Sequence, residues 1–387
     1  MARSNRKIFK YLIPTFIILL YVGYAGIKVV YANEPIKETQ QNVENVVADS
    51  SVNTAETSAE HKPAEEHKEA KLDAGKLIME HIADAHDWHI ATIGHNHISI
   101  PLPVIIKDAN GLHVFSSSHL HEGEVYQGYK IEEGKIIAEN GNDDFYDLSI
   151  TKNVAAMFIA VFALLWIMLS IAGSYKRNGI VAPKGIQSFV EPLIFFIRDE
   201  VAIPSIGKKY EKYLPYLLTI FFFIFFNNIF GLIPFFPGGA NVTGNISITM
   251  ILALFTFAIT SFSAKKEYWI HIINTPGVPW WLKFPVPLMP IVELIGVFSK
   301  PFVLMVRLFA NITAGHIIML GFFSLIFIFA EMNTGLGFGV SIFSVAFTTF
   351  MSFLELLVAF LQAYVFTLLS ALYFGMAIEE HHSEEHH

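Results

Sequence analysis

Long apolar stretches fill most of the chain after about residue 150 and alternate with short polar segments. Three of them, at 154–174, 214–236 and 246–264, are close to the length of about 20 residues that a helix needs to cross a bilayer. Two others, at 284–330 and 335–378, are much longer. A continuous helix of that length would extend about 65 to 70 Å, roughly twice the hydrocarbon core. We therefore expect two long helices that are either strongly tilted or broken.

A shorter amphipathic segment at 187–201 precedes the second of these spans. Its apolar residues recur at helical spacing and oppose a charged cluster: Phe189, Leu193, Phe196 and Ile197 against Arg198, Asp199 and Glu200. Such a helix is typical of a membrane surface. Residues 149–387 are thus predicted to form an all-α polytopic membrane protein, with three ordinary membrane spans, one interfacial helix and a hairpin of two long, strongly tilted helices.

The N-terminal part of the chain has a different composition. Residues 1–32 combine a basic start, an apolar stretch and small residues up to Ala32, which is the pattern of a secretory signal peptide. An uncleaved membrane anchor is the alternative interpretation. Residues 33–72 contain almost no large apolar side chains and are predicted to be a disordered periplasmic linker.

Residues 73–148 are predicted to form a small α+β domain outside the membrane. A short helical pattern opens this region, and strand-like patterns and turns follow. The strand patterns are at 98–106, 112–115 and 126–138, and the turns are at 108–111 and 132–134.

Ten of the sixteen histidines of the chain lie in this domain and its linker. Eight of them are candidate metal ligands: His81, His86, His89, His95, His97, His113, His119 and His121. The chain has no cysteine, and no acidic residue stands at a zinc-finger spacing from them. We interpret them as solvated surface histidines and expect neither a metal nor a cofactor, with a metal site as the alternative.

The distribution of charge predicts the orientation of the chain. Basic residues gather in the loops 175–213 and 265–283, whereas the loops 237–245 and 331–334 contain no Lys or Arg. Because basic loops remain cytoplasmic, the folded N-terminal part is predicted to lie outside, in the periplasm, and the C-terminus inside, in the cytoplasm. We expect the membrane to be a bacterial inner membrane. The net charge of −8 arises mostly outside the apolar spans and gives no indication of nucleic-acid binding.

Arg307 is a charged residue within the fourth apolar stretch, where a charge is unfavourable unless it has a partner. A charged residue at the centre of a membrane helix costs about 2.5 to 3.5 kcal/mol on insertion scales. On a helical wheel, Glu293, Lys300, Arg307 and Asn311 share one narrow face, although Pro301 is a candidate kink between the first two and the last two. An external partner that carries a membrane-embedded carboxylate is the simplest explanation for Arg307. For Glu293 and Lys300, a structural ion pair near the cytoplasmic surface is an alternative.

The fifth apolar stretch contains a second polar row. Glu355 is its only ionisable residue apart from tyrosines, and Gln362 follows seven residues later on nearly the same face. His316 is about 140° away from Asn311 on the wheel, so we expect it to face a different aqueous route from the one at Arg307.

These residues carry a resemblance to a known family. The string from Arg307 to His316 (RLFANITAGH), the preceding Glu293 and Ser299-Lys-Pro301, and the later Glu355 with Leu361-Gln-Ala363 resemble subunit a of the F-type ATP synthase. The resemblance covers about residues 150–380. The region 33–148 departs from the shorter N-terminus that is common in the family.

The resemblance implies a non-catalytic, proton-conducting subunit of the membrane stator. Arg307 would face the carboxylates of the rotating c-ring, His316 and Glu355 would form an outer half-channel, and Glu293 an inner one. Asn311 and Gln362 complete the set that the resemblance implies for proton translocation. Many bacterial members have Glu and then His at the positions of His316 and Glu355, and the opposite order here resembles the mitochondrial arrangement. The implied partners are the c-ring, the b subunits of the peripheral stalk and the lipid membrane.

Two other functional classes are weaker alternatives. A secondary transporter would use Arg307 to bind an anionic substrate, but such folds usually contain internal repeats, and the Arg307 motif occurs once. A periplasmic metal sensor with a simple membrane anchor would have no use for ionisable residues inside its spans. The sequence does not distinguish a proton from a sodium ion, nor does it give the size of the c-ring.

Overall fold

The computed structural model describes residues 82–379, with gaps at 94–95, 121–123, 133, 142–144, 179–181, 234–235 and 275–287, together with residues 75, 78 and 79. The predicted signal peptide and linker lie outside the described residues. So does most of the predicted short helix around residue 80.

Long apolar helices make up most of the described chain. The helices are α4 (Lys152–Asn178), α5 (Ile186–Phe196), the π-helical segment η2 (Ile197–Ala202), α6 (Ile203–Ile206), the short 3-10 turn η3 (Gly207–Lys209), α7 (Tyr210–Leu232), α8 (Ile246–Ser263), α9 (Lys266–Ile273), α10 (Leu288–Met332) and α11 (Thr334–Ile378). In the described part of the chain, five helical stretches are long and apolar enough to cross a membrane. The chain is therefore a mostly α-helical, polytopic membrane protein, as the apolar pattern predicted.

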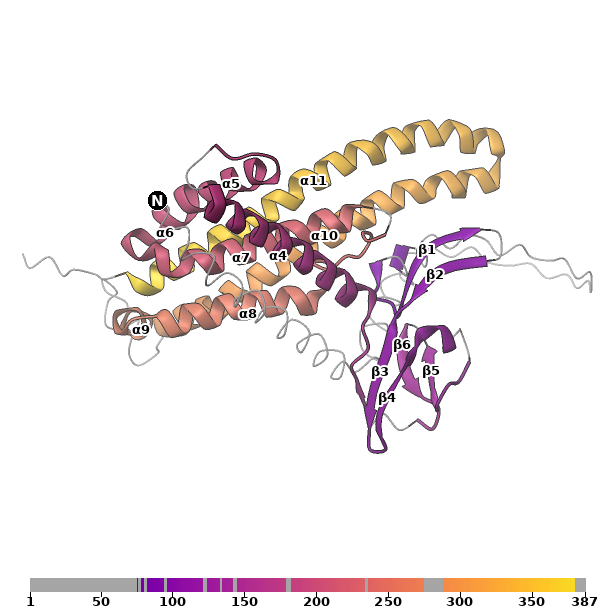
Figure 1. Cartoon of the computed structure of the whole chain (residues 1–387), viewed down its shortest axis with the longest axis horizontal. Helices are drawn as coiled ribbons and strands as arrows, with labels where there is room; N and C mark the ends of the chain where they lie inside the picture. The colour runs from indigo at the N-terminus through magenta and orange to yellow at the C-terminus, as the bar shows by residue number, and fades with distance from the viewer. Residues whose placement is uncertain are drawn as a thin grey trace, which may run out of the picture.

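The two longest helices form a hairpin. α10 and α11 are joined through Asn333 alone and run back side by side from this turn (Figure 1). The side chain of Asn333 accepts a hydrogen bond from the backbone N–H of Gly335 at 2.8 Å, which caps α11. Gly337 lies so close to the backbone of Ala330 that an added Cβ would be 2.8 Å from its Cα. The tight turn therefore depends on a small residue at this point.

Neither long helix is broken. Pro301 lies inside α10, but the helix continues through it from Leu288 to Met332. Of the two arrangements expected for segments of this length, the unbroken one is observed. The segment before the second span is also more continuous than predicted. Apolar helical residues extend from Ile186 to Leu232, through a π-helical turn and a change of direction at Gly207, whose φ is +68°.

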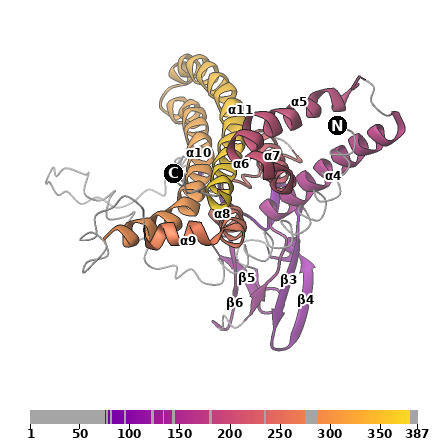
Figure 2. The same cartoon turned by 90° about the vertical axis from the view of Figure 1, so that its left-hand side faces the viewer.

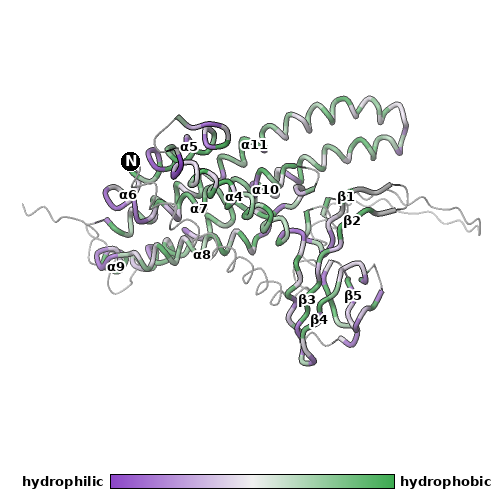
Figure 3. The backbone as a smooth tube through the Cα atoms, in the orientation of Figure 1, coloured by the Kyte–Doolittle hydropathy of each residue, from purple (hydrophilic) through white to green (hydrophobic). Residues whose placement is uncertain are grey.

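One large apolar core holds the helices together. α7 lies at its centre, with Leu217, Ile220 and Phe221 fully buried. α11 approaches α6 so closely that a Cβ on Gly375 would meet the carbonyl oxygen of Ser205 at 2.0 Å. The hydropathy colouring shows mostly apolar tubes for α7, α8, α10 and α11, with hydrophilic residues around α6 and α9 at one end (Figure 3).

In the part of the chain that the structure describes, seven short strands precede α4. They are β1 (Asp87–Ile93), β2 (Asn96–Pro101), β3 (Pro103–Asp108), β4 (Gly111–Ser116), β5 (Tyr129–Glu132), β6 (Lys135–Ala138) and β7 (Tyr146–Asp147). They form a β1-β2 ribbon, a sheet in the order β4-β3-β7 and a β5-β6 ribbon, all antiparallel. The predicted strand at 98–106 is divided in two at Leu102. The predicted turn at 108–111 joins β3 to β4, where Asp108 pairs with Gly111.

The strands lie at the same end of the helices as the tip of the α10–α11 hairpin, but on the opposite side of the bundle from it, and α6 and α9 lie at the other end (Figures 1 and 2). They have a small apolar core of their own, which includes Val104, Ile106 and Phe115. Trp88 of β1 is different, because it belongs to the core of the helices. The stranded region is thus attached to the helical part through β1.

Candidate functional site

A histidine and a glutamate meet inside the α10–α11 hairpin. The Nδ1 atom of His316 on α10 lies 3.1 Å from the Oε1 atom of Glu355 on α11. The two residues are only 8% and 7% exposed. The second carboxylate oxygen of Glu355 is also buried, and no described group donates a hydrogen bond to it. A buried carboxylate with one unused oxygen, beside an imidazole, can accept and pass on a proton.

Gly315 makes this approach sterically feasible. An added Cβ at Gly315 would lie 2.5 Å from Oε1 and 3.2 Å from Cγ of Glu355. Separations under 3 Å are far inside van der Waals contact, so any side chain here would displace the glutamate. The Gly315-His316 dipeptide therefore supplies both the space for Glu355 and its hydrogen-bonding partner.

Arg307 and Asn311 lie on another side of α10. Both are exposed, whereas Leu304, Leu308 and Ile312 on the same stretch of helix are buried against the rest of the chain. The structure thus separates two sets of polar groups on one helix, a buried one at His316 and an exposed one at Arg307. Helical periodicity predicted that Arg307 and His316 lie on different faces.

Gln362 and Glu293 are not part of the histidine–glutamate contact. Gln362 is buried on α11, seven residues after Glu355. Glu293 is half-buried near the start of α10 and interacts electrostatically with Lys300. The Nζ atom of Lys300 lies 5.6 Å from the ring centre of Tyr373 and 6.0 Å from that of Tyr268, beside a small pocket between α8, α10 and α11.

A further group of buried polar residues, which was not predicted from the sequence, lies around the end of α7. Asn228 is 3% exposed and donates from Nδ2 to the carbonyl oxygen of Ala359 on α11 at 3.1 Å. Its Oδ1 atom accepts a hydrogen bond from the hydroxyl of Thr243, in the loop between α7 and α8. The paired asparagines at 227 and 228, inside an otherwise apolar span, were the available signal.

The same loop reaches the vicinity of His316. The hydroxyl of Thr313, three residues before His316, donates to the carbonyl oxygen of Gly244 at 3.4 Å. At Gly231 an added Cβ would lie 3.3 Å from the carbonyl oxygen of Ala240 and 3.9 Å from Nε2 of His316. The loop and the histidine ring thus both lie close to Gly231.

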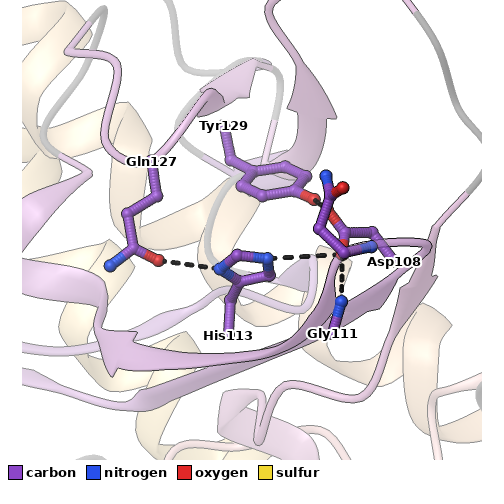
Figure 4. Close-up of polar contacts among 6 residues, drawn as sticks. Asp108, Gly111, His113, Gln127 and Tyr129 are labelled. Atoms are coloured by element: carbon purple, nitrogen blue, oxygen red, sulfur yellow. Dashed lines mark hydrogen bonds and ion pairs between the residues drawn. The ribbon is translucent and has the colours of Figure 1, made fainter.

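In the stranded region, His113 has ordinary hydrogen-bonding partners. Its Nε2 and Nδ1 atoms lie 3.3 Å from Oδ1 of Asp108 and 3.2 Å from Oε1 of Gln127 (Figure 4). His119 stacks on Tyr126. Within the described parts of the chain, no three His, Asp or Glu side chains converge in a way that could hold a metal ion. His81, His95 and His121 lie outside the described residues, and the side chains of His89 and His97 are not described either.

Asp108 and Tyr129 shift each other's ionisation. Partial desolvation raises the pKa of Asp108, but hydrogen bonds from the Tyr129 hydroxyl and from the backbone N–H groups of Asn110 and Gly111 outweigh it. The pKa of Asp108 is therefore lower than usual. Desolvation, followed by the hydrogen bond to Asp108 and its charge, raises the pKa of Tyr129 to about 12.

Comparison with known proteins agrees with this architecture. The model of the ATP synthase A chain family matches residues 154–375, and the model of a domain of unknown function matches residues 77–156. ATP synthase subunit a of Chloroherpeton thalassium is 45% identical over 250 residues, which cover 62% of this chain and 71% of that protein. Subunit a of Chlorobium phaeobacteroides strain DSM 266 is 37% identical over 336 residues, covering 84% and 82%. Subunit a of Anaeromyxobacter sp. is 35% identical over 328 residues, covering 81% and 73%.

The fold and the buried polar pair define an α-helical membrane protein with ionisable groups inside its helices. The chain belongs to the ATP synthase A chain family. Membership in this family associates the chain with ATP synthesis and proton transport, as one membrane subunit of a larger complex.

Proposed function

We propose that this chain is the proton-conducting stator subunit of an F-type ATP synthase and does no catalysis itself. It would provide two aqueous half-channels and an essential arginine, which exchange protons with the carboxylates of a rotating c-ring. The exposure of Arg307 on a largely apolar helix is the observation that carries this proposal. A guanidinium at such a position needs a carboxylate, and no ion pair of Arg307 occurs among the described residues.

The two sets of polar groups support a proposed path for the proton. A proton from outside would enter by way of His316 and Glu355 and reach a rotor carboxylate, which becomes neutral and can turn into the lipid. After nearly a full turn, the carboxylate would release the proton into an inner half-channel near Glu293. Arg307 would favour the ionised form of the arriving carboxylate and repel protons that might leak between the half-channels. Asn311 and Gln362 would line the same path.

The orientation and the domains are also part of this proposal. The basic loops at 175–213 and 265–283 support a cytoplasmic side at α9, and therefore a periplasmic stranded region and a cytoplasmic C-terminus. Residues 1–32 would be a signal peptide, 33–72 a linker and 73–148 a periplasmic domain, followed by the membrane domain at 149–387. α5 and the π-helical turn would lie along the membrane surface, and the b subunits would be the other partners.

Because the chain contains no cysteine, it offers a clean background for cross-linking. We expect Asn311→Cys to form a disulfide with a cysteine placed beside the rotor carboxylate, since Asn311 is exposed on the side of Arg307. Leu308→Cys is the matched control, because Leu308 is only 1% exposed on the same helix and faces the core. Equal cross-linking from both positions, or none from Asn311→Cys in assembled complexes, would contradict the placement of the rotor.

A further inference from the structure

The contact between Trp88 and Phe236 joins two regions that the sequence separates widely. Trp88 lies on β1, and Phe236 lies in the loop between α7 and α8. Their ring centres are 5.1 Å apart and their planes are inclined by 69°, which is an edge-to-face contact (Figure 1 shows β1 beside the helices). Trp88 is 4% exposed, whereas Phe236 is 47% exposed. The tryptophan is therefore the anchored partner and the loop aromatic is the one that it holds.

The position of Trp88 is itself fixed by the start of α4. The Oδ1 atom of Asp84 accepts a hydrogen bond from the backbone N–H of Asn153 at 3.0 Å, and the backbone N–H of Lys152 donates to the carbonyl oxygen of Ala85 at 2.8 Å. Residues 84–88 thus form a strap that begins at the first turn of α4 and ends on the α7–α8 loop.

The other side of this loop lies near His316. Thr243 bonds to Asn228, and the carbonyl oxygen of Gly244 accepts from Thr313, less than one helical turn before His316. The carbonyl oxygen of Ala240 and Nε2 of His316 both lie within 4 Å of the position that a Cβ of Gly231 would take. The loop therefore touches the stranded region on one side and the surroundings of His316 on the other.

We infer that Trp88 is a positioning residue for proton entry: through Phe236, the stranded region holds the α7–α8 loop in place as an outer wall beside His316. This inference rests on the proposed function, because the wall has a role only if protons pass His316. Residues 84–88 would then belong to the proton-conducting part of the chain and would not serve only to attach the strands. The match of a second family model to residues 77–156 indicates that this strap belongs to a recurring unit.

The test uses the complete complex, reconstituted in vesicles, with proton flux driven by an imposed potential. Trp88→Ala and Phe236→Ala should each reduce flux about two- to tenfold, the range by which one aromatic pair changes an equilibrium. Flux in the double variant should be no slower than in the slower of the two single variants, because both changes remove the same contact. Trp88→Phe should restore most of the flux, because it retains an aromatic edge. Val104→Ala is the control, since Val104 is fully buried in the separate core of the strands and does not touch the loop.

Hydrogen exchange provides a local measurement that does not depend on flux. The backbone N–H of Gly239 donates to Phe230, and that of Gly244 donates to the side chain of Asn241. Both should exchange faster in Trp88→Ala and remain unchanged in Val104→Ala.

Normal flux and normal loop exchange in assembled Trp88→Ala complexes would overturn the inference. If Trp88→Ala does not assemble, Phe236→Ala decides by the same two measurements, because it changes only a half-exposed loop side chain. The proposed function fails separately, if His316→Ala conducts protons as well as the unmodified chain. Slow flux in His316→Ala together with normal flux in Phe236→Ala would leave the proposed function intact and remove the role of the strap.

Discussion

The imidazole of His316 and the carboxylate of Glu355 are in hydrogen-bonding contact at 3.1 Å, although 39 residues separate them in the chain. Both are more than nine-tenths buried. Removal of either group should slow proton flux by about 10²-fold or more, which is the lower range for a positioned proton-transfer group. The exchange His316→Glu with Glu355→His should recover part of the flux, because the contact is preserved with its partners reversed. A double exchange no faster than the single alanine variants would show that the two groups do not share a relay. Flux in reconstituted vesicles is the measurement.

Gly315→Ala should impair flux although it adds only one methyl group. The new Cβ would lie 2.5 Å from Oε1 of Glu355, so the glutamate would have to leave His316. Gly321→Ala on the same helix meets no atom within 4 Å and is the matched control. In the control, replacement of a helical glycine by alanine should stabilise the helix by roughly 0.5 to 1 kcal/mol and leave flux unchanged. Equal flux in the two variants would mean that the close approach at Gly315 has no functional consequence.

The ionisation of Tyr129 tests the geometry of the stranded region. Its phenol should titrate at about 12, measured as the difference in phenolate absorbance between the unmodified protein and Tyr129→Phe. Asp108→Asn should lower this pKa toward the ordinary value of about 10, because it removes the negative charge that opposes ionisation. A Tyr129 that titrates near 10 in the unmodified protein would contradict the contact.

The same pair gives the stranded region a stability that depends on pH. The pKa of Tyr129 is raised, so its contribution is present below about pH 10 and is lost as pH rises toward about 12. The pKa of Asp108 is lowered, so its contribution is present above the ordinary aspartate pKa and is lost as pH falls below it. Hydrogen exchange of the β3–β4 hairpin should therefore accelerate at both extremes. In Asp108→Asn the acid part of this dependence should disappear.

Much of the helical architecture could be predicted from the sequence, because the membrane imposes a simple rule on apolar length. The spans, the long hairpin and the different faces of Arg307 and His316 all follow from helical periodicity. The contact between His316 and Glu355 could not be predicted in this way. It depends on the register of α10 against α11 and on the space at Gly315. Periodicity within one helix contains no information about either.

The contacts that reach outside a single helix were not predictable in the same way. The strap at Asp84 and Trp88 joins residues about 70 and 150 positions apart in the chain, and nothing local in the sequence indicates those partners. Pro301 was a candidate kink. The helix α10 is not interrupted there, since it continues from Leu288 to Met332, and a bend at the proline stays a prediction. The buried Asn228 was visible as a polar residue in an apolar span, but its partner Thr243 was not.

The proton flux of Arg307→Ala decides whether the arginine is essential for exchange with the rotor. In complexes that contain the normal amount of this chain, the variant should abolish ATP-driven proton pumping into vesicles and leave ATP hydrolysis by the detached soluble part unchanged. Arg307→Lys should rescue pumping poorly, because lysine lacks the planar guanidinium and loses its proton more readily when desolvated. Pumping by Arg307→Ala at the unmodified rate would contradict the account.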